Sequence, residues 1–202
     1  MIQNCTLAAT AALALAFSAP ALAEDAPDLS PAVSGEYAAD AEHAYIQFSY
    51  LHQGYSRPLL RWGDFDATLD WNQDDPAASS VDVVIDATSV DSGVERFNGH
   101  LQGENMFDTA NFPTITFKST SVEKTSDTTG KVTGDLTIKD VTKPVTLDVT
   151  FNKAGATRDG GAKVGFSGAT KLNRSDWGLG FLVPMVGDEV SIQVEIEFVK
   201  GA

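Results

Sequence analysis

The segment from Lys131 to Asn152 constrains the fold more than any other part of the chain. It contains two runs in which apolar and polar residues alternate, the first over 132–138 and the second over 145–151. A period of two places successive side chains on opposite faces of a β-strand, so each run predicts a strand with one apolar face. Between the runs we expect a turn that ends at Pro144, because proline has no N–H to give to a strand ladder. The segment therefore predicts a β-hairpin whose apolar face must be covered.

The same alternation recurs along the rest of the chain and predicts six more strands, over 44–50, 63–71, 81–85, 113–117, 164–170 and 190–198. Ser92 to Glu95 resembles a capping box, which predicts a short helix up to about Leu101, between the third and fourth strands. Glycines inside strands usually mark bends, and four of them favour closure of the sheet: Gly63, Gly134, Gly165 and Gly168. We predict an all-β fold, an eight-stranded antiparallel β-barrel. The interior of such a barrel is either filled by side chains or wide enough for one small ligand.

Residues 1–23 predict a secretory signal peptide that is cleaved after Ala23. Thr6 to Phe17 form a short apolar run, and Ala21-Leu22-Ala23 is a small-x-small cleavage site. The run is too short to cross a bilayer, which needs about 20 residues. Residues 24–34 carry prolines and acidic side chains without periodicity and predict a flexible leader. The barrel domain would then span 35–202, and the bacterial periplasm is the expected location.

Cysteine content and charge limit the possible functions. The single cysteine, Cys5, lies in the predicted signal peptide, so the exported domain must be stable without a disulfide. The formal net charge of −14 repels phosphate backbones, so we expect no nucleic-acid partner. No later segment stays apolar for 18 residues, so no integral membrane segment is expected.

Several motifs together point to one family. The most specific is Gly134-Asp-Leu-Thr-Ile-Lys-Asp-Val-Thr-Lys-Pro144, followed by Asn173-Arg-Ser-Asp-Trp-Gly178. Further matches are the His-x-Gly-x-Ser turn from His52 to Ser56, Arg96 with His100 and Leu101, Phe107-Asp108, and residues 111–120. These segments resemble the YceI-like family of bacterial polyisoprenoid-binding proteins, which have a lipocalin-like barrel. One departure is Leu60-Arg61-Trp62, where the family commonly has Gly-x-Phe. This bulkier segment would narrow or reshape an entrance to the barrel.

The resemblance implies an exported carrier that holds a long-chain isoprenoid or another lipid inside the barrel without changing it chemically. It implies no cofactor apart from that lipid, and a possible homodimer. The lipid tail would contact the inward faces of the strands: Phe48, Tyr50, Phe65, Leu69, Val83, Ile85, Phe117, Leu136, Ile138, Val149 and Phe166. A headgroup would contact a polar rim: His52, Arg96, His100, Arg174, Asp176 and Trp177.

Three alternatives remain open from the residues alone. The apolar faces would also fill a solid core, as in a structural or adhesion module. Arg174 and Asp176 would equally well pair with each other, or with the backbone, to fix their loop. His52 and Ser56 offer the atoms of a hydrolase acting on such a lipid, but the chain has no Gly-x-Ser-x-Gly elbow. His43, His52 and His100 fit no zinc motif, so we predict no metal site.

Overall fold

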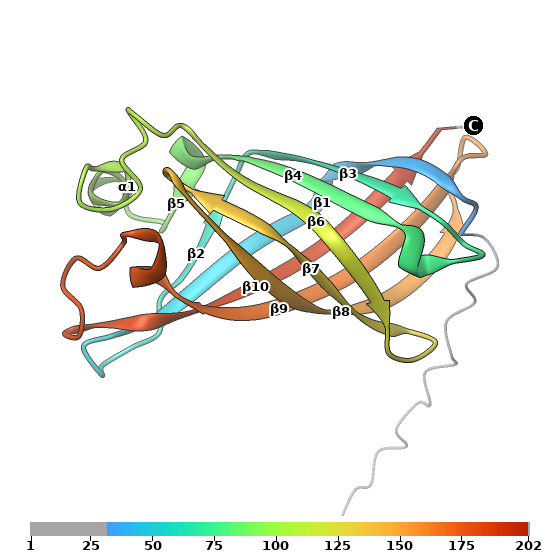
Figure 1. The fold of residues 1–202 in the computed structure, drawn as a ribbon. Coiled ribbons are helices and arrows are strands. Elements are labelled where there is room, and N and C mark those ends of the chain that lie inside the picture. The colour runs from blue at the N-terminus through green and yellow to red at the C-terminus, as the bar shows by residue number, and fades with distance from the viewer. Residues whose placement is uncertain (1–31, 202) are drawn as a thin grey trace, which may run out of the picture.

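A closed antiparallel β-barrel forms the body of the protein, as seen in a computed structural model that describes residues 32–201 (Figure 1). Within these residues the strands are β1 (Gly35–His52), β2 (Leu59–Trp62), β3 (Phe65–Trp71), β4 (Ser80–Asp86), β5 (Val90–Asp91), β6 (Thr114–Lys124), β7 (Thr129–Ile138), β8 (Val141–Ala156), β9 (Ala162–Asn173) and β10 (Val186–Lys200). The ring follows the order β1, β3, β4, β6, β7, β8, β9 and β10, and β10 pairs with β1 to close it. The predicted eight-stranded barrel is confirmed.

Two short strands extend the sheet at one end of the ring. The early part of β1 pairs with β3, from Gly35 opposite Trp71 to Ala38 opposite Thr68. Its later part pairs with β2, and β2 in turn pairs with β5. The periodicity did not reveal β2 or β5, because strands of four and two residues are too short to show an alternation.

The central hairpin forms as predicted, but its turn is tighter. β7 ends at Ile138 and β8 begins at Val141, so the turn consists of Lys139 and Asp140. Lys139 has a positive φ of 57°, which a two-residue hairpin turn requires. The expectation that Pro144 marks the edge of the turn is wrong, since it lies within β8 opposite Asp135. A proline is tolerated there because β8 pairs with β9 only from Asp148 onward, which leaves one edge of β8 without a ladder.

The helix α1 (Glu95–Gln102) lies between β5 and β6, after η2 (Ala87–Ser89). Its position confirms the prediction, but the predicted capping box does not form. Val94 is the N-cap residue and makes no side-chain cap hydrogen bond. The Ser92 hydroxyl instead donates to Asn98 Oδ1 at 2.6 Å, which ties the preceding loop to the helix.

The described residues just before the predicted domain boundary also pack against the barrel. Ala32 is fully buried, and Trp71 Nε1 donates to its carbonyl oxygen at 2.9 Å. The Ser34 hydroxyl accepts from the backbone N–H of Gln73 at 2.8 Å. The last three residues of the predicted leader are therefore packed against the barrel. The predicted signal peptide and the rest of the leader lie outside the described residues.

Two groups of buried side chains lie toward the two ends of the barrel. The first lies near α1 and the short helix η3 (Arg174–Trp177) and includes Leu60, Leu101 and Phe107. The second lies where the described chain begins and ends, and includes Tyr37 and Phe198. Throughout 32–201 no helix is long and apolar enough to cross a membrane.

Candidate ligand-binding cavity

A cavity of about 460 Å³ occupies the interior of the barrel between the two ends. Its wall consists of inward-facing apolar side chains on all eight ring strands: β3, β4, β6 to β10, and the middle of β1. Nine residues that the alternation predicts for a lipid tail line it: Phe65, Leu69, Val83, Ile85, Phe117, Leu136, Ile138, Val149 and Phe166. The barrel is therefore hollow, and its lining offers a hydrocarbon surface to a guest.

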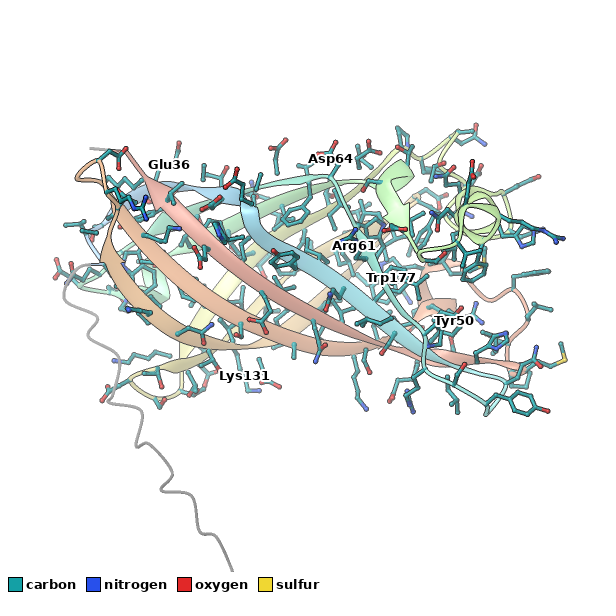
Figure 2. The ribbon with its side chains drawn as sticks, turned by 180° about the vertical axis from the view of Figure 1, so that it is seen from behind. Glu36, Tyr50, Arg61, Asp64, Lys131 and Trp177 are labelled. Carbon is teal, nitrogen blue, oxygen red and sulfur yellow. The ribbon has the colours of Figure 1, made fainter. Side chains whose placement is uncertain are left out.

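Two other residues predicted for the tail are placed elsewhere. Phe48 is buried against Trp62, with ring centroids 4.4 Å apart, and does not line the cavity. Tyr50 lies farther along β1, near the end that carries α1 (Figure 2). Burial raises the pKa of the Tyr50 hydroxyl, and the nearby Arg174 guanidinium partly opposes the shift. Both side chains belong to the solid packing beyond the cavity.

The sequence reasoning also missed part of the lining, although the signal was present. Nine further lining residues continue the same period of two or flank it: Ile46, Ile115, Val132, Val145, Leu147, Ile192, Val194, Ile196 and Phe198. β10 alternates cleanly from Val190 to Phe198, so its inward face could have been included without new information.

An aromatic layer closes the cavity toward α1. Trp62 lines the inner end and packs against Phe48 and Phe107, whose ring centroid lies 5.7 Å from the indole. Trp62, Phe107 and Leu101 are each less than one-tenth exposed. Within the described residues, the indole N–H of Trp62 is buried without a hydrogen-bond partner. This layer is the floor of the cavity.

The cavity reaches the surface at the other end. There its lining changes from apolar to polar, on the β3–β4 connection with η1 (Pro76–Ala78) and on the β6–β7 turn. The exposed residues at this border are Gln73, Ser80, Glu123, Lys124, Ser126, Asp127 and Thr129. We call this border the mouth. Figure 1 shows η1 and the β6–β7 turn at the end of the barrel away from α1.

The six residues predicted for a polar rim lie at the closed end, and none of them lines the cavity. His52 is at the end of β1, and Arg96 and His100 are exposed on α1. Asp176 in η3 pairs with Lys143 Nζ at 3.4 Å. Trp177 is buried and donates from Nε1 to the Leu136 carbonyl oxygen at 3.1 Å. Figure 2 shows Trp177 and Tyr50 together at this end.

Arg174 has the role that the sequence left open as its alternative, fixing a loop through the backbone. Its guanidinium donates to the carbonyl oxygens of Gly187 at 2.9 Å, Phe181 at 3.0 Å and Val186 at 3.1 Å, and also to that of Leu179. The side chain is only 6% exposed, and burial lowers the pKa of Arg174, which Asp188 and then Tyr50 partly oppose. These bonds hold the loop between η3 and β10 in place. Four of the five N–H donors of Arg174 are thus already used.

The family follows from comparison with known proteins. The YceI-like domain matches residues 37–198. The chain belongs to the YceI-like family. It is 36% identical over 171 residues to Protein YceI from Escherichia coli O157:H7, a match that covers 84% of this chain and 89% of that protein. Among solved structures, BcnA from Burkholderia cenocepacia has a TM-score of 0.72 at 26% identity, over 79% of this chain and 98% of that chain. A polyisoprenoid binding domain from Saccharophagus degradans shares the fold, with a TM-score of 0.61 at 15% identity over 80% and 97% of the two chains.

In this YceI-like protein the unusual segment Leu60-Arg61-Trp62 does not form an entrance. Leu60 is 1% exposed and Trp62 is 7% exposed, both facing inward from β2. Arg61 faces outward and pairs with Asp91, with Nη2 and Oδ2 3.2 Å apart. The segment therefore shapes the floor of the YceI-like cavity and leaves the mouth unaffected.

The geometry gives no support to a hydrolytic site at His52. His52 and Ser56 form an isolated β-bridge, in which the His52 N–H donates to the Ser56 carbonyl oxygen at 2.8 Å. Both residues are exposed in a turn outside the cavity. Among the hydrogen bonds of residues 32–201, none joins the imidazole of His52 to the Ser56 hydroxyl.

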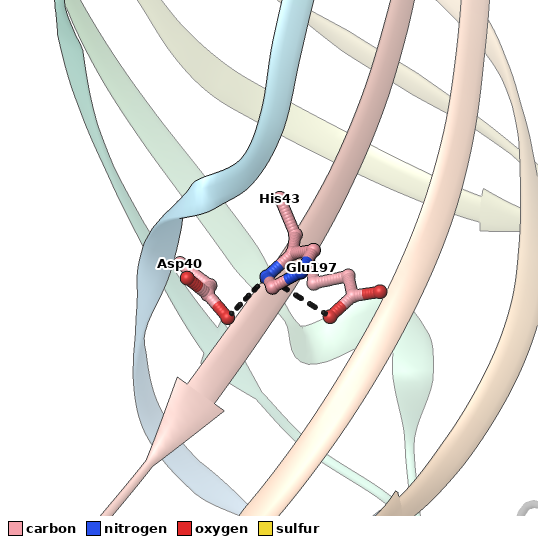
Figure 3. A group of neighbouring side chains, drawn as sticks. All are labelled: Asp40, His43 and Glu197. Carbon is pink, nitrogen blue, oxygen red and sulfur yellow. Dashed lines mark hydrogen bonds and ion pairs between the residues drawn. The ribbon is translucent and has the colours of Figure 1, made fainter.

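One side-chain cluster on the outer surface was not foreseen. His43 Nδ1 lies 3.0 Å from Asp40 Oδ2 and 4.0 Å from Glu197 Oε2 (Figure 3). Such a set resembles the donors of a metal site. However, the Lys163 ammonium contacts both carboxylates, at 3.1 Å from Asp40 and 2.6 Å from Glu197. Hydrogen bonds to Glu197 and Asp40 raise the pKa of Lys163, and those from His43 and Lys163 lower the pKa of Asp40. We assign the cluster as an ion-pair network between β1, β9 and β10.

Proposed function

We propose that this YceI-like protein binds a long-chain isoprenoid or a related lipid inside the barrel and carries or sequesters it without chemical change. The observation that carries the proposal is the continuous apolar cavity enclosed by the barrel strands. The polyisoprenoid binding domain of Saccharophagus degradans has the same barrel fold, which makes the proposed ligand class compatible with this architecture.

The energetics favour recognition by the tail. Burying about 10 methylenes contributes about 8 kcal/mol before ordering costs, which is close to the free energy of a micromolar complex. A single charge-assisted hydrogen bond contributes only about 1.5–3 kcal/mol. The tail would therefore set the affinity. Chain length would be discriminated weakly, because each further methylene adds about 0.8 kcal/mol.

Export to the periplasm is part of the proposal. It rests on the apolar run and the cleavage motif in residues 1–23, which lie outside the described residues. N-terminal sequencing of the protein from a periplasmic fraction should begin at Glu24. Recovery of the unprocessed chain from the cytosol would contradict export.

Extraction and mass spectrometry test the binding function directly. Protein purified without detergent is extracted with organic solvent, and the extract is compared with that of a variant whose cavity is filled, Leu136→Trp. We expect a lipid in near-stoichiometric amount from the natural protein and much less from the variant. Equal traces of lipid in both would contradict a ligand held in the cavity.

A further inference from the structure

The mouth of the cavity carries a net negative charge and lacks the groups that hold a phosphate. Among its lining residues, the charged ones are Glu123, Lys124 and Asp127, which sum to −1. The ammonium of Lys124 is already paired, 3.2 Å from Asp127 Oδ1. Phosphate recognition in proteins normally uses guanidinium forks or free ammonium groups. No arginine lines the cavity within the described residues.

Residues around the mouth add to its negative charge. The connection that leads into η1 carries Asp74 and Asp75, and Asp75 accepts from the Ala77 N–H as the cap of η1. The whole chain has a formal charge of −14, so no distant positive field compensates. An anionic headgroup placed here would be repelled and would also lose part of its hydration.

The uncharged polar groups at the mouth have a different chemistry. The hydroxyls of Ser80, Ser126 and Thr129 and the amide of Gln73 lie on the border between the apolar lining and solvent. Hydroxyl and amide groups donate to and accept from neutral oxygen atoms. A carbonyl or an alcohol at the end of a lipid chain matches this border.

The closed end cannot take the headgroup instead. Trp62, Phe48 and Phe107 separate the cavity from the side where Arg96 and Arg174 lie. Four of the five N–H donors of Arg174 are used by backbone carbonyl oxygens. A lipid that fills the cavity with its tail toward Trp62 must therefore leave its polar end at the mouth.

We propose that the mouth selects lipids with an uncharged oxygen-bearing headgroup, such as an alcohol or a carbonyl, and discriminates against phosphorylated lipids with the same tail. This inference rests on the proposed function, since it assumes that the cavity holds a lipid tail. Selection arises at the mouth by charge, while the tail supplies the affinity.

The test compares two probes that share one tail, farnesol and farnesyl diphosphate. Binding to the delipidated full-length protein is followed by tryptophan fluorescence, because Trp62 and Trp71 both line the cavity. We expect farnesol to bind about tenfold more tightly than the diphosphate at low salt. The difference should shrink at high ionic strength, because the charges at the mouth are exposed.

Two charge variants locate the effect. Asp127→Lys should tighten binding of the diphosphate and leave farnesol unchanged, because it reverses the sign of the mouth. Glu104→Lys makes the same change in net charge at an exposed position beyond α1, so it should alter neither probe. Equal affinity of the two probes, or tighter binding of the diphosphate, would overturn the selection while leaving lipid binding intact. If neither probe binds, the proposed function fails, and headgroup selection fails with it.

Discussion

Leu136→Trp is the most direct test that the cavity holds a lipid tail. Leu136 lies on β7 opposite Lys143 of β8 and Phe117 of β6, and its side chain lines the cavity. The new indole has about six more non-hydrogen atoms than leucine, and these would displace about six carbons of a bound chain at about 0.8 kcal/mol each. The upper limit is about 5 kcal/mol, or more than three orders of magnitude in affinity. A chain that shifts toward the mouth recovers part of this, so we expect a loss of at least about tenfold.

The control for this substitution uses the same strand and the same introduced residue. Asp135 neighbours Leu136, and its exposed side chain lies on the outer face of β7, so Asp135→Trp leaves the cavity unchanged. Both variants are titrated with farnesol, and their unfolding in urea is measured in parallel. Overpacking should cost the inner variant about 1–3 kcal/mol of stability without preventing folding. A folded Leu136→Trp protein that binds as tightly as Asp135→Trp would refute the placement of the tail in this cavity.

Three further outcomes test the packing and the surface ion pairs. Arg174→Met should lower the free energy of unfolding by about 2–4 kcal/mol in urea denaturation, because it leaves one buried and three part-buried carbonyl oxygens without their donor. Arg174→Lys should not restore it, since an ammonium lacks the planar fork. Gly134→Ala should be destabilising by about 1–3 kcal/mol, because the new Cβ would lie 2.5 Å from a ring carbon of Phe117 on β6. Gly168→Ala should be tolerated, because its Cβ would lie 3.5 Å from the nearest atom, a methyl carbon of Leu147. The stabilisation from Asp40 should be present above its ordinary pKa of 3.8 and be lost as the pH falls through its lowered pKa in the folded protein. The stabilisation from Lys163 should be present below its ordinary pKa of 10.5 and be lost as the pH rises through its raised pKa in the folded protein. The unfolding free energy of the natural protein minus that of Lys163→Met should therefore form a plateau of about 0.2–1 kcal/mol between those limits, and a difference independent of pH at both extremes would contradict the network.

The sequence predicted the wall of the cavity because the wall depends on one local rule. Side chains alternate across each strand, and the face that contains Leu136 and Ile138 must face inward once the sheet closes. Most of the predicted lining therefore lies where the alternation places it. The same rule holds for Phe48, which also faces inward, and yet this residue does not reach the cavity.

What alternation cannot supply is height along the barrel axis. Phe48 and Phe65 have the same strand pattern, but only Phe65 lies level with the open interior. The height depends on strand tilt, on the bulge between Ala39 and Ala44 of β1, and on pairings between residues far apart in sequence. The predicted rim was misplaced for the same reason. His52 and Arg96 lie at an end of the barrel, but only the packing of Trp62 against Phe48 and Phe107 shows that this end is closed.

The distribution of side-chain size along the axis explains why an apolar interior stays hollow. Rings gather at the two ends, with Phe48 and Trp62 in one group and Trp71 and Phe151, stacked at 5.6 Å, in the other. Between them the wall is mostly valine, leucine and isoleucine, and these side chains leave the cavity of about 460 Å³ open. The ring of Phe117 lies in the middle of the barrel and is held against the wall. It lies over Gly134 of β7, which is paired with Ser119 of β6 and has no side chain to displace the ring. An unfilled apolar space costs stability in proportion to its volume, so a barrel that is closed at one end and open at the mouth carries this cost while it is empty. A guest of hydrocarbon character would recover that cost by restoring the missing contacts.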